Sequence, residues 1–172
     1  MPTGYSLDTS ESEVDQSGPG KFCKELGSVQ DEYKADAKAD VGFQKGDVSI
    51  AGGAFLGENI GRYASAKSAK DAFDAFADAV GKCSAFDTKD ADGSTFKGTF
   101  ATMSFSKVGD ETFASRLSGE AGSADLTLPV AGSIVVVREG NLTMLVVALG
   151  IGAVTIQTTE VEQVVVKGHN KL

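Results

Sequence analysis

Residues 134–149 read IVVVREGNLTMLVVAL, two apolar runs that are joined by a short polar segment. The Gly140-Asn141 pair suits a tight turn, because glycine and asparagine tolerate the positive φ angles that such turns need. The stretch therefore predicts an antiparallel hairpin with strands over 134–138 and 142–149. Both runs are apolar at nearly every position, so we expect two central strands that are buried on both faces, with a helix covering the face away from the main core.

The residues around this hairpin predict further strands. Residues 39–64 alternate apolar and polar side chains between glycines, which is typical of two or three short strands with glycine turns. Residues 111–118 alternate cleanly, with Phe113 and Leu117 on one side. The polar residues 87–94 are expected to form a loop.

Two of the predicted strands contain an irregularity. In residues 95–105 the large side chains change parity near Ala101, which indicates a bulge or a break, because a one-residue slip moves every later side chain to the other face. Residues 126–130 alternate Leu, Leu and Val in a separate short strand. Pro129 in that strand requires an edge position or a bulge, because proline cannot donate a backbone hydrogen bond.

Helical periodicity is clearest over residues 68–82, where one stripe of Ala, Phe and Val side chains opposes a charged stripe. Ser65 or Ser68 is expected to cap the start of this helix. A shorter helix is expected over residues 21–29.

The C-terminal residues 159–172 also have helical spacing. Thr159 and Glu162 stand in the arrangement of a capping box, which favours a helix start there. Val164, Val165 and Val166 are β-branched and form helices poorly, so packing must hold this helix in place.

Together these elements predict an α+β fold in which two main helices flank a mostly antiparallel, twisted sheet. The length of 172 residues suits one domain. Residues 1–20 are polar and acidic, end in Gly18-Pro19-Gly20 and predict a flexible arm that only Tyr5 and Leu7 could anchor. We expect residues 21–172 to form the single domain.

Charge and hydropathy exclude several classes of function. The net charge of −8 repels nucleic-acid phosphates, so nucleic acid is not an expected partner. The most apolar stretch, residues 142–154, is too short and too interrupted by glycine to cross a bilayer as a helix. No export signal and no lipid-attachment cysteine follow Met1, so we expect any such segment to have been removed or never to have been present.

The sequence contains no recognisable catalytic or metal-binding motif, and no cofactor is predicted. The single histidine, His169, lies among polar residues near the C-terminus, where it suits a solvated helix end. Asp110 and Glu111 are adjacent carboxylates in a turn-like stretch, and a solvated loop is the expected reading. The segment 88–99 matches a calcium loop only in part, since threonine stands at both its first and twelfth positions, and a turn is favoured over a metal site.

The three arginines, Arg62, Arg116 and Arg138, all occur in predicted strands. If they shared one face, they could bind a carboxylate or phosphate bidentately, and they are the candidate anion or ligand patch. An ordinary ion-paired or solvated sheet face explains them as well.

The two cysteines, Cys23 and Cys83, lie far from the spacing of a zinc or thioredoxin-type motif. Their spacing leaves two alternatives open, which are a single disulfide and two free thiols.

Several segments together resemble the cell-envelope sensor-type domains of actinobacteria, which are lipoproteins and extracellular domains of receptor serine/threonine kinases with a PknH-like sensor fold. The segments are Pro2-Thr3-Gly4-Tyr5, Tyr63, Ala72-Phe73 and Phe76-Ala77 in the Ala-rich helix, Cys83 at its end, and residues 135–141. The resemblance implies export, tethering at the outer face of the membrane and a disulfide between Cys23 and Cys83. The kinase sensor domains have more cysteines than these two, so none of their cleft residues is carried over.

The resemblance and the missing catalytic groups predict a non-enzymatic extracytoplasmic ligand-binding or sensor-type domain of a cell-envelope lipoprotein. Its expected partner is a small molecule, a lipid or an envelope protein, and its expected contact with the membrane is an N-terminal lipid anchor outside this chain. The alternative is a structural or protein-interaction lipoprotein without a small ligand, which a flat apolar patch would favour over a cavity. A hydrolase with an unfamiliar site would instead need a pocket that holds a carboxylate with a strongly raised pKa.

Overall fold

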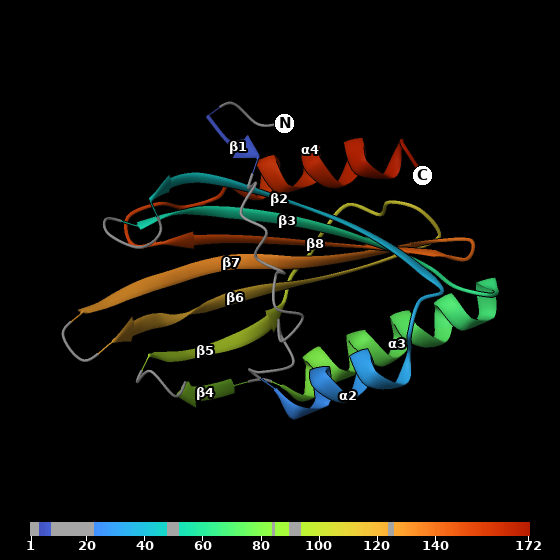
Figure 1. Cartoon of the computed structure of the whole chain (residues 1–172), viewed down its shortest axis with the longest axis horizontal. Coiled ribbons are helices and arrows are strands. Elements are labelled where there is room, and N and C mark those ends of the chain that lie inside the picture. Colours follow the sequence, from blue (N-terminus) through green and yellow to red (C-terminus); the bar gives the residue numbers. More distant parts are fainter. Residues whose placement is uncertain (1–3, 8–22, 48–51, 84, 90–93, 124–125) are drawn as a thin grey trace.

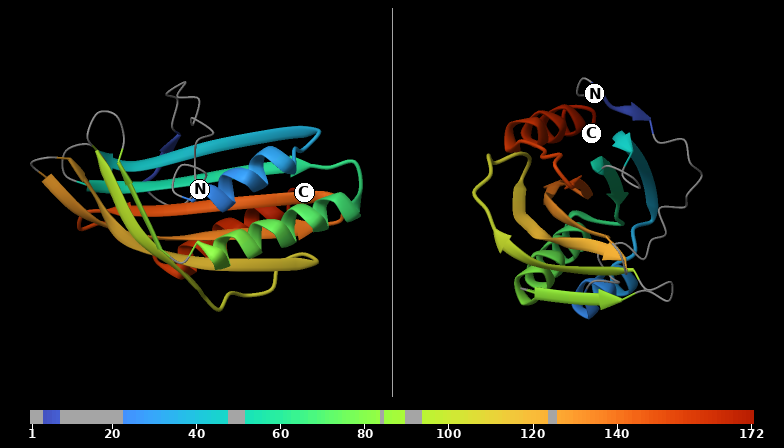
Figure 2. Two further views of the ribbon diagram at one scale, coloured as in Figure 1. Left: turned by 90° about the horizontal axis from the view of Figure 1, so that it is seen from below. Right: turned by 90° about the vertical axis from the view of Figure 1, so that its left-hand side faces the viewer.

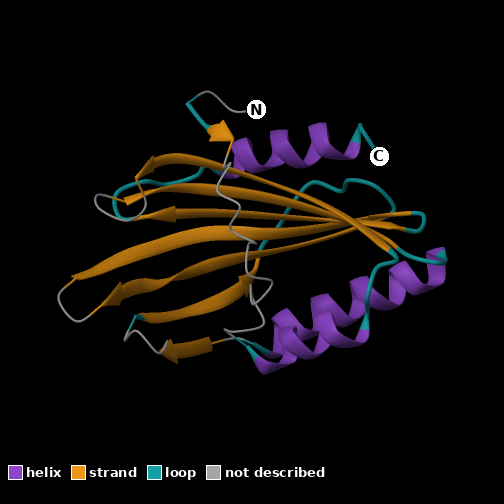
Figure 3. Cartoon of the chain, in the orientation of Figure 1, coloured by secondary structure: helices purple, strands orange, loops and turns teal. Residues whose placement is uncertain are grey.

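The fold is α+β, with one eight-stranded antiparallel sheet between helices (Figures 1 and 3). The computed structural model describes residues 4–7, 23–47, 52–83, 85–89, 94–123 and 126–172. The strand order is β1-β2-β3-β8-β7-β6-β5-β4. The strands are β1 (Ser6–Leu7), β2 (Ala37–Asp47), β3 (Gly52–Arg62), β4 (Ala85–Lys89), β5 (Thr95–Thr102), β6 (Glu111–Ser123), β7 (Leu126–Glu139) and β8 (Leu142–Ile151).

The predicted central hairpin is confirmed as β7 and β8. Glu139 pairs with Leu142 across the turn, and Gly140 takes the positive φ of 55° that the turn requires. The two strands lie in the middle of the sheet and are buried on both faces. Val135 and Val137 point to one core, and Ile134 and Val136 point to the other.

The separate strand that was expected over residues 126–130 is wrong, because these residues are the first part of the long strand β7. Here β7 pairs with β6 but has run past the end of β8, whose last paired residue, Ile151, lies opposite Val130. Pro129 therefore lies where β7 is locally an edge, and its carbonyl accepts a hydrogen bond from the Gly152 amide at 2.8 Å. Proline has no backbone N–H to donate, but no residue of β8 lies opposite Pro129, so no hydrogen bond between β7 and β8 is lost.

Three other expectations about strands need refinement. Residues 39–64 contain two long strands, β2 and β3, where two or three short ones were expected. The first three residues of the expected loop over 87–94 belong to strand β4, which pairs with β5. No bulge or break lies near Ala101: the register with β6 is regular to Thr102 and continues with Met103 opposite Ala114, so ordinary alternation places Met103 and Phe105 on the α4 face and Phe100 on the other.

One face of the sheet packs on helix α4 (Thr158–His169), and this core contains Ala114, Met144 and Val146 beneath Val161 and Val165. The N-cap of this helix is Gln157, two residues before the predicted N-cap Thr159. Its capping box is formed by Gln157 and Glu160 and not by Thr159 and Glu162, which is a correction to the predicted cap. Val161, Val165 and Gly168 form the stripe of α4 that is buried.

The other face packs on helix α3 (Ala66–Lys82), and helix α2 (Lys24–Glu32) lies mainly against α3 (Figure 2). Ser65 caps α3 as predicted, since its hydroxyl accepts a hydrogen bond from the Ser68 amide at 3.0 Å. This core contains Phe73 and Val80 of α3 above Phe100 and Leu117 of the sheet.

The described part of the N-terminal arm lies on the sheet. Residues Ser6 and Leu7 pair with β2, Tyr5 is buried in the core below α4, and Leu7 remains 52% exposed. Residues 8–20 lie outside the described residues, so the division into an arm and a domain stays a prediction.

Candidate functional site

A shallow, mainly apolar groove lies between α4 and residues 103–110, which connect β5 to β6. Its volume is about 410 Å³. The groove runs along the α4 face of the sheet, beside the core that α4 covers. The residues that line it are Phe105, Ser106, Val108, Thr159, Glu162, Gln163, Val166 and Lys167.

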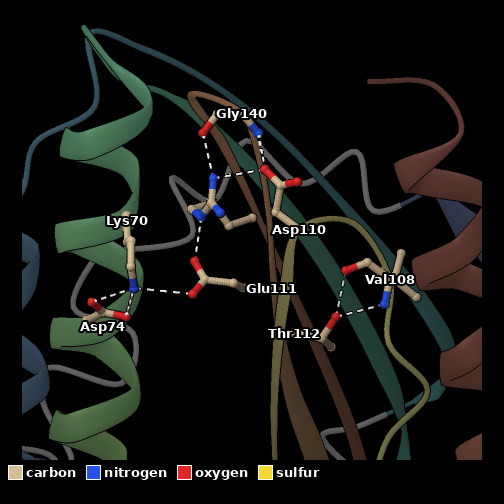
Figure 4. A network of polar contacts seen from close by, with 8 residues as sticks. Lys70, Asp74, Val108, Asp110, Glu111, Thr112 and Gly140 are labelled. Atoms are coloured by element: carbon tan, nitrogen blue, oxygen red, sulfur yellow. Dashed lines mark hydrogen bonds and ion pairs between the residues drawn. The ribbon is translucent and has the colours of Figure 1, made fainter.

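The 103–110 segment is fixed in place by backbone hydrogen bonds. The Met103 amide donates to the Ala114 carbonyl at 3.1 Å. The Thr112 hydroxyl accepts from the Val108 amide at 2.8 Å and donates to the Val108 carbonyl at 2.6 Å, as Figure 4 shows. Gly109 has a φ of 66°, and an added Cβ there would meet the Arg138 carbonyl oxygen at 2.7 Å, so only glycine fits this approach to β7.

The groove has an apolar base and a polar rim. Phe105 is half-buried and Val108 is buried, whereas Val166 on α4 is 43% exposed. The Ser106 hydroxyl donates a hydrogen bond to the Glu162 carboxylate at 3.2 Å and so joins the two walls. Such a lining suits an apolar group held by a few polar contacts.

A second groove of about 320 Å³ lies between α2 and α3. Its rim holds Glu25, Glu32 and Asp78, and its base holds Val29 and Ala79. This groove lies between two helices and not beside the sheet.

Arg138, one of the three candidate arginines, is hydrogen-bonded to two carboxylates, those of Asp110 and Glu111, which Figure 4 labels. Its Nε donates to Glu111 at 2.6 Å and its Nη1 donates to Asp110 at 2.9 Å. Lys70 of α3 completes the cluster with an ion pair to Glu111 at 3.2 Å. The guanidinium is therefore a structural link between the β7–β8 hairpin and α3, and not an open anion site.

Within this cluster the carboxylates and the cations shift each other's pKa values so that both kinds of group stay charged. The Gly140 amide and the Arg138 guanidinium lower the pKa of Asp110. Hydrogen bonds from Arg138 and Lys70 lower the pKa of Glu111, and those carboxylates raise the pKa of Arg138. The adjacent carboxylates that the sequence places in a turn are therefore both ionised partners of one cation.

The strand register does not bring the three arginines to one face. Arg138 shares the parity of Ile134 and Val136 on the α3 side. Arg62 and Arg116 have the parity of the α4 side and are exposed, but they lie on strands β3 and β6, which β8 and β7 separate. An anion-binding role for Arg62 or Arg116 alone stays a prediction.

Cys23 and Cys83 form a disulfide with a Cα–Cα distance of 6.0 Å. Cys23 is the N-cap of α2 and Cys83 is the C-cap of α3, so the bond joins the two helices where their ends meet. Both residues are buried in the core of the α3 face. Of the two alternatives that the spacing left open, the structure has the disulfide.

The other residues that the sequence singled out belong to contacts between helices and strands or to paired strands. The His169 Nε2 lies 3.2 Å from the Glu139 carboxylate, which links the end of α4 to the hairpin. Thr88 and Thr99 of the partial calcium loop belong to the paired strands β4 and β5, while Asp90, Asp92 and Gly93 lie outside the described residues. Within the described ranges, no three His, Cys, Asp or Glu side chains are placed to hold a metal ion.

Sequence reasoning missed the groove because its two walls are about fifty residues apart in the chain. The one available signal is that the large side chains Met103 and Phe105 have the opposite parity to Phe96 and Phe100 and therefore lie on the other face of the sheet. That signal does not show that α4 lies on this face.

Among the described helices, none combines the length and the apolar character that crossing a membrane requires. No protein-family model matches the sequence, and no curated protein matches it. The fold is similar to that of a solved structure, the extracellular domain of PknH from Mycobacterium tuberculosis. The TM-score is 0.62 at 14% sequence identity, and the match covers 98% of this chain and 78% of that chain. At this identity the likeness establishes a shared fold.

Proposed function

We propose that this chain is a non-enzymatic, extracytoplasmic sensor-type domain of a cell-envelope lipoprotein, and that the groove between α4 and residues 103–110 receives its ligand. The observation that carries the proposal is the likeness of nearly the whole fold to the extracellular domain of PknH. Fold alone does not give function, so the groove and the disulfide have to support it independently.

The disulfide supports the compartment. Such bonds persist in oxidising environments outside the cytoplasm and are rare in reducing ones. Cys23 and Cys83 are both buried, as expected of a structural bond. The N-terminus of the unprocessed gene product tests the lipoprotein assignment, because a lipid-attachment cysteine after an apolar segment is required. Its absence would refute that part of the proposal.

The chemistry of the groove supports binding and not catalysis. Its apolar lining is formed by Phe105, Val108 and the exposed Val166, and its two charged side chains are Glu162 and Lys167. Among the described residues that line it there is neither a histidine nor a cysteine. An apolar base with few polar groups binds a ligand by burial of apolar surface.

The test is a fluorescence titration with anilinonaphthalene sulfonate, a dye that brightens in apolar sites. We expect the native protein to bind the dye and Gln163→Trp to lose this binding, because the exposed Gln163 lines the groove and the indole would fill it. The matched control is Ser118→Trp, an exposed position on β6 away from the groove, which should leave binding unchanged. Equal binding by both variants would place the dye elsewhere and contradict the groove.

The alternative is a protein-interaction or structural lipoprotein without a small ligand. The shallowness of both grooves favours it, because neither encloses a ligand on all sides. This alternative predicts that the native protein does not brighten the dye at all. It still predicts the disulfide and an export signal in the unprocessed gene product.

A further inference from the structure

The outer side of strand β2 is only partly covered by another strand. There β1 pairs with β2 at Phe43 and Gln44, beside the C-terminal half of β2 (Figure 1). In the part of the chain that the structure describes, no other strand pairs with this side of β2. Residues 37–40 are exposed. The first half of β2 is therefore an open sheet edge.

The backbone groups of every second residue point out of this edge. The Tyr63 amide donates to the Asn141 carbonyl at 2.9 Å, in the register of β3 with β8. In an antiparallel sheet, successive residues direct their N–H and C=O groups to opposite sides of the strand. The even-numbered residues of β3 therefore bond to β2, where they lie opposite odd-numbered residues. The N–H and C=O groups of Lys38 and Asp40 thus point away from β3, toward the open side.

The side chains of the same two residues carry opposite charges. Lys38 and Asp40 are two residues apart, so they lie on one face of the sheet. Beside them on β3 lie Gly61 and Asn59, which are uncharged. Charges on an open edge normally prevent pairing with other chains. A strand that places an acid opposite Lys38 and a base opposite Asp40 would instead match this edge, because opposite charges stabilise a cross-strand pair.

A second copy of β2 is such a strand. In antiparallel pairing about a two-fold axis perpendicular to the sheet, the residue on the axis lies opposite itself. With Ala39 on the axis, Lys38 of each copy lies opposite Asp40 of the other, and Ala37 of each lies opposite Val41 of the other. One ladder of residues 37–41 thereby contains two pairs of opposite charge.

The neighbouring registers do not fit. An axis at Lys38 or at Asp40 places like charges directly opposite each other, which destabilises a ladder. An axis beyond Asp40 brings Ala39 against Phe43, which already pairs with β1. With Ala39 on the axis, the ladder ends before Phe43, so β1 of each copy stays in place. The charges and the position of β1 therefore select a single register.

From the open edge and its charge pattern we infer that two copies of this chain associate through β2, with Ala39 on the two-fold axis. This goes beyond the proposed function, because the association does not use the groove between α4 and residues 103–110. The ladder is short, and each copy has a net charge of −8, so we expect weak association in dilute solution.

The first test is a disulfide cross-link in Ala39→Cys. Both native cysteines are already bonded to each other, so the new thiol is free to react. In the inferred dimer the two copies of position 39 form a pair without hydrogen bonds, with a Cα–Cα distance of about 4.5 Å. This distance is within the range of a disulfide. We expect a covalent dimer on a non-reducing gel after mild oxidation.

The matched control is Ala37→Cys, at another exposed alanine of β2. In the same register the two copies of position 37 lie four residues apart along the strand, or about 13 Å, which is too far for a disulfide. We expect little cross-linking there. Equal cross-linking at both positions, or none at position 39, would overturn the inference. The second outcome includes the case in which the chain's own residues cover the edge.

The second test is sedimentation equilibrium at physiological salt. Lys38→Asp places acid opposite acid at two points and should weaken dimerisation about tenfold. Asp40→Lys should weaken it to a similar extent. Lys38→Asp/Asp40→Lys restores both opposite-charge pairs and should return the dimerisation constant to its native value. Both positions are exposed, so all three variants should keep the native thermal midpoint.

The rescue is the decisive result, because two separate structural roles would add their losses in the double variant. A double variant that dimerises no better than either single variant would overturn the inference. A native protein that stays monomeric at about 1 mM would do so too. The dye titration with Gln163→Trp reports on the groove separately, so failure of one result leaves the other interpretable.

Discussion

The two faces of the central sheet are covered by helices that are held in different ways. On one face, α3 is a long helix with i,i+4 ion pairs, an ion-paired link through Lys70 and Glu111 to Arg138, and a disulfide to α2. On the other face, α4 is shorter and contains three consecutive valines. Among the described residues, its side-chain contact with the sheet is the partly exposed one between His169 and Glu139.

The difference shows that α3 is held by its helix-forming sequence and by polar links, whereas α4 is held by close packing against the sheet. The α4 layer needs Gly168, where an added Cβ would meet Met144 Sδ and Glu58 Oε1 at 2.8 Å. The α3 layer contains Gly81, where an added Cβ would meet no atom within 4 Å. Substitutions on the two faces should therefore act through different mechanisms.

The largest expected effect is on the α3 face. Cys23→Ser/Cys83→Ser opens a loop with a sequence separation of 60 residues. It should lower the free energy of unfolding by about 4 kcal/mol in the chain-entropy limit, as measured by urea denaturation. Hydrogen exchange should rise first in α2, which packs mainly on α3, while β7 and β8 stay protected. Unchanged exchange in α2 would show that packing alone holds it.

The next effect is on the α4 face. Gly168→Val should lower the free energy of unfolding by about 2 kcal/mol, because the side chain overpacks the contact with Met144. The same substitution at Gly81 in α3 is the control and should be neutral or slightly stabilising, by at most about 0.5 kcal/mol. Equal losses at both positions in thermal unfolding would remove the distinction between the two layers.

A smaller effect is expected from the polar link on the α3 side. Arg138→Gln should cost about 1–2 kcal/mol in urea denaturation, because its side chain is only 12% exposed and it donates to two carboxylates. The pKa values of Asp110 and Glu111 are lowered in the folded state, so their contribution is present above the unfolded pKa of about 4.

This contribution should be lost as the pH falls through the lowered values. The stability difference between the native protein and Arg138→Gln should therefore be constant above about pH 5 and should shrink below about pH 4. A difference that grows on acidification would contradict the assignment.

The smallest expected effect is from the polar link of α4. His169→Gln should change the free energy of unfolding by less than about 1 kcal/mol, because the partner carboxylate of Glu139 is 45% exposed and solvent screens the pair. A double-mutant cycle with Glu139→Gln measures the coupling. A coupling as large as the cost of Arg138→Gln would show that both layers rely on polar links.

Sequence reasoning identified the strong local patterns and failed where two local signals competed. The hairpin turn at Gly140 was predicted from neighbouring residues, and Ser65 is one of the two caps that were predicted for α3. The bulge or break that was expected near Ala101 was wrong, because the two faces of β5 carry large side chains in different parts of the strand. The strand that was expected to be separate at Pro129 was wrong, because proline permits a strand wherever the neighbouring strand has already ended. The cap of α4 was misplaced by two residues, because two overlapping sets of polar residues fit the same capping pattern.

The sequence by itself determined that the chain forms an α+β fold around a hairpin buried on both faces, since alternation, turn glycines and helix caps act over a few residues. Only the tertiary structure decided that Arg138 lies among carboxylates while Arg62 and Arg116 lie on the other side, and that α4 borders a groove with residues 103–110. The physical reason is that side-chain alternation fixes which residues share a face within one strand. The pairing of strands distant in the chain then fixes which faces coincide.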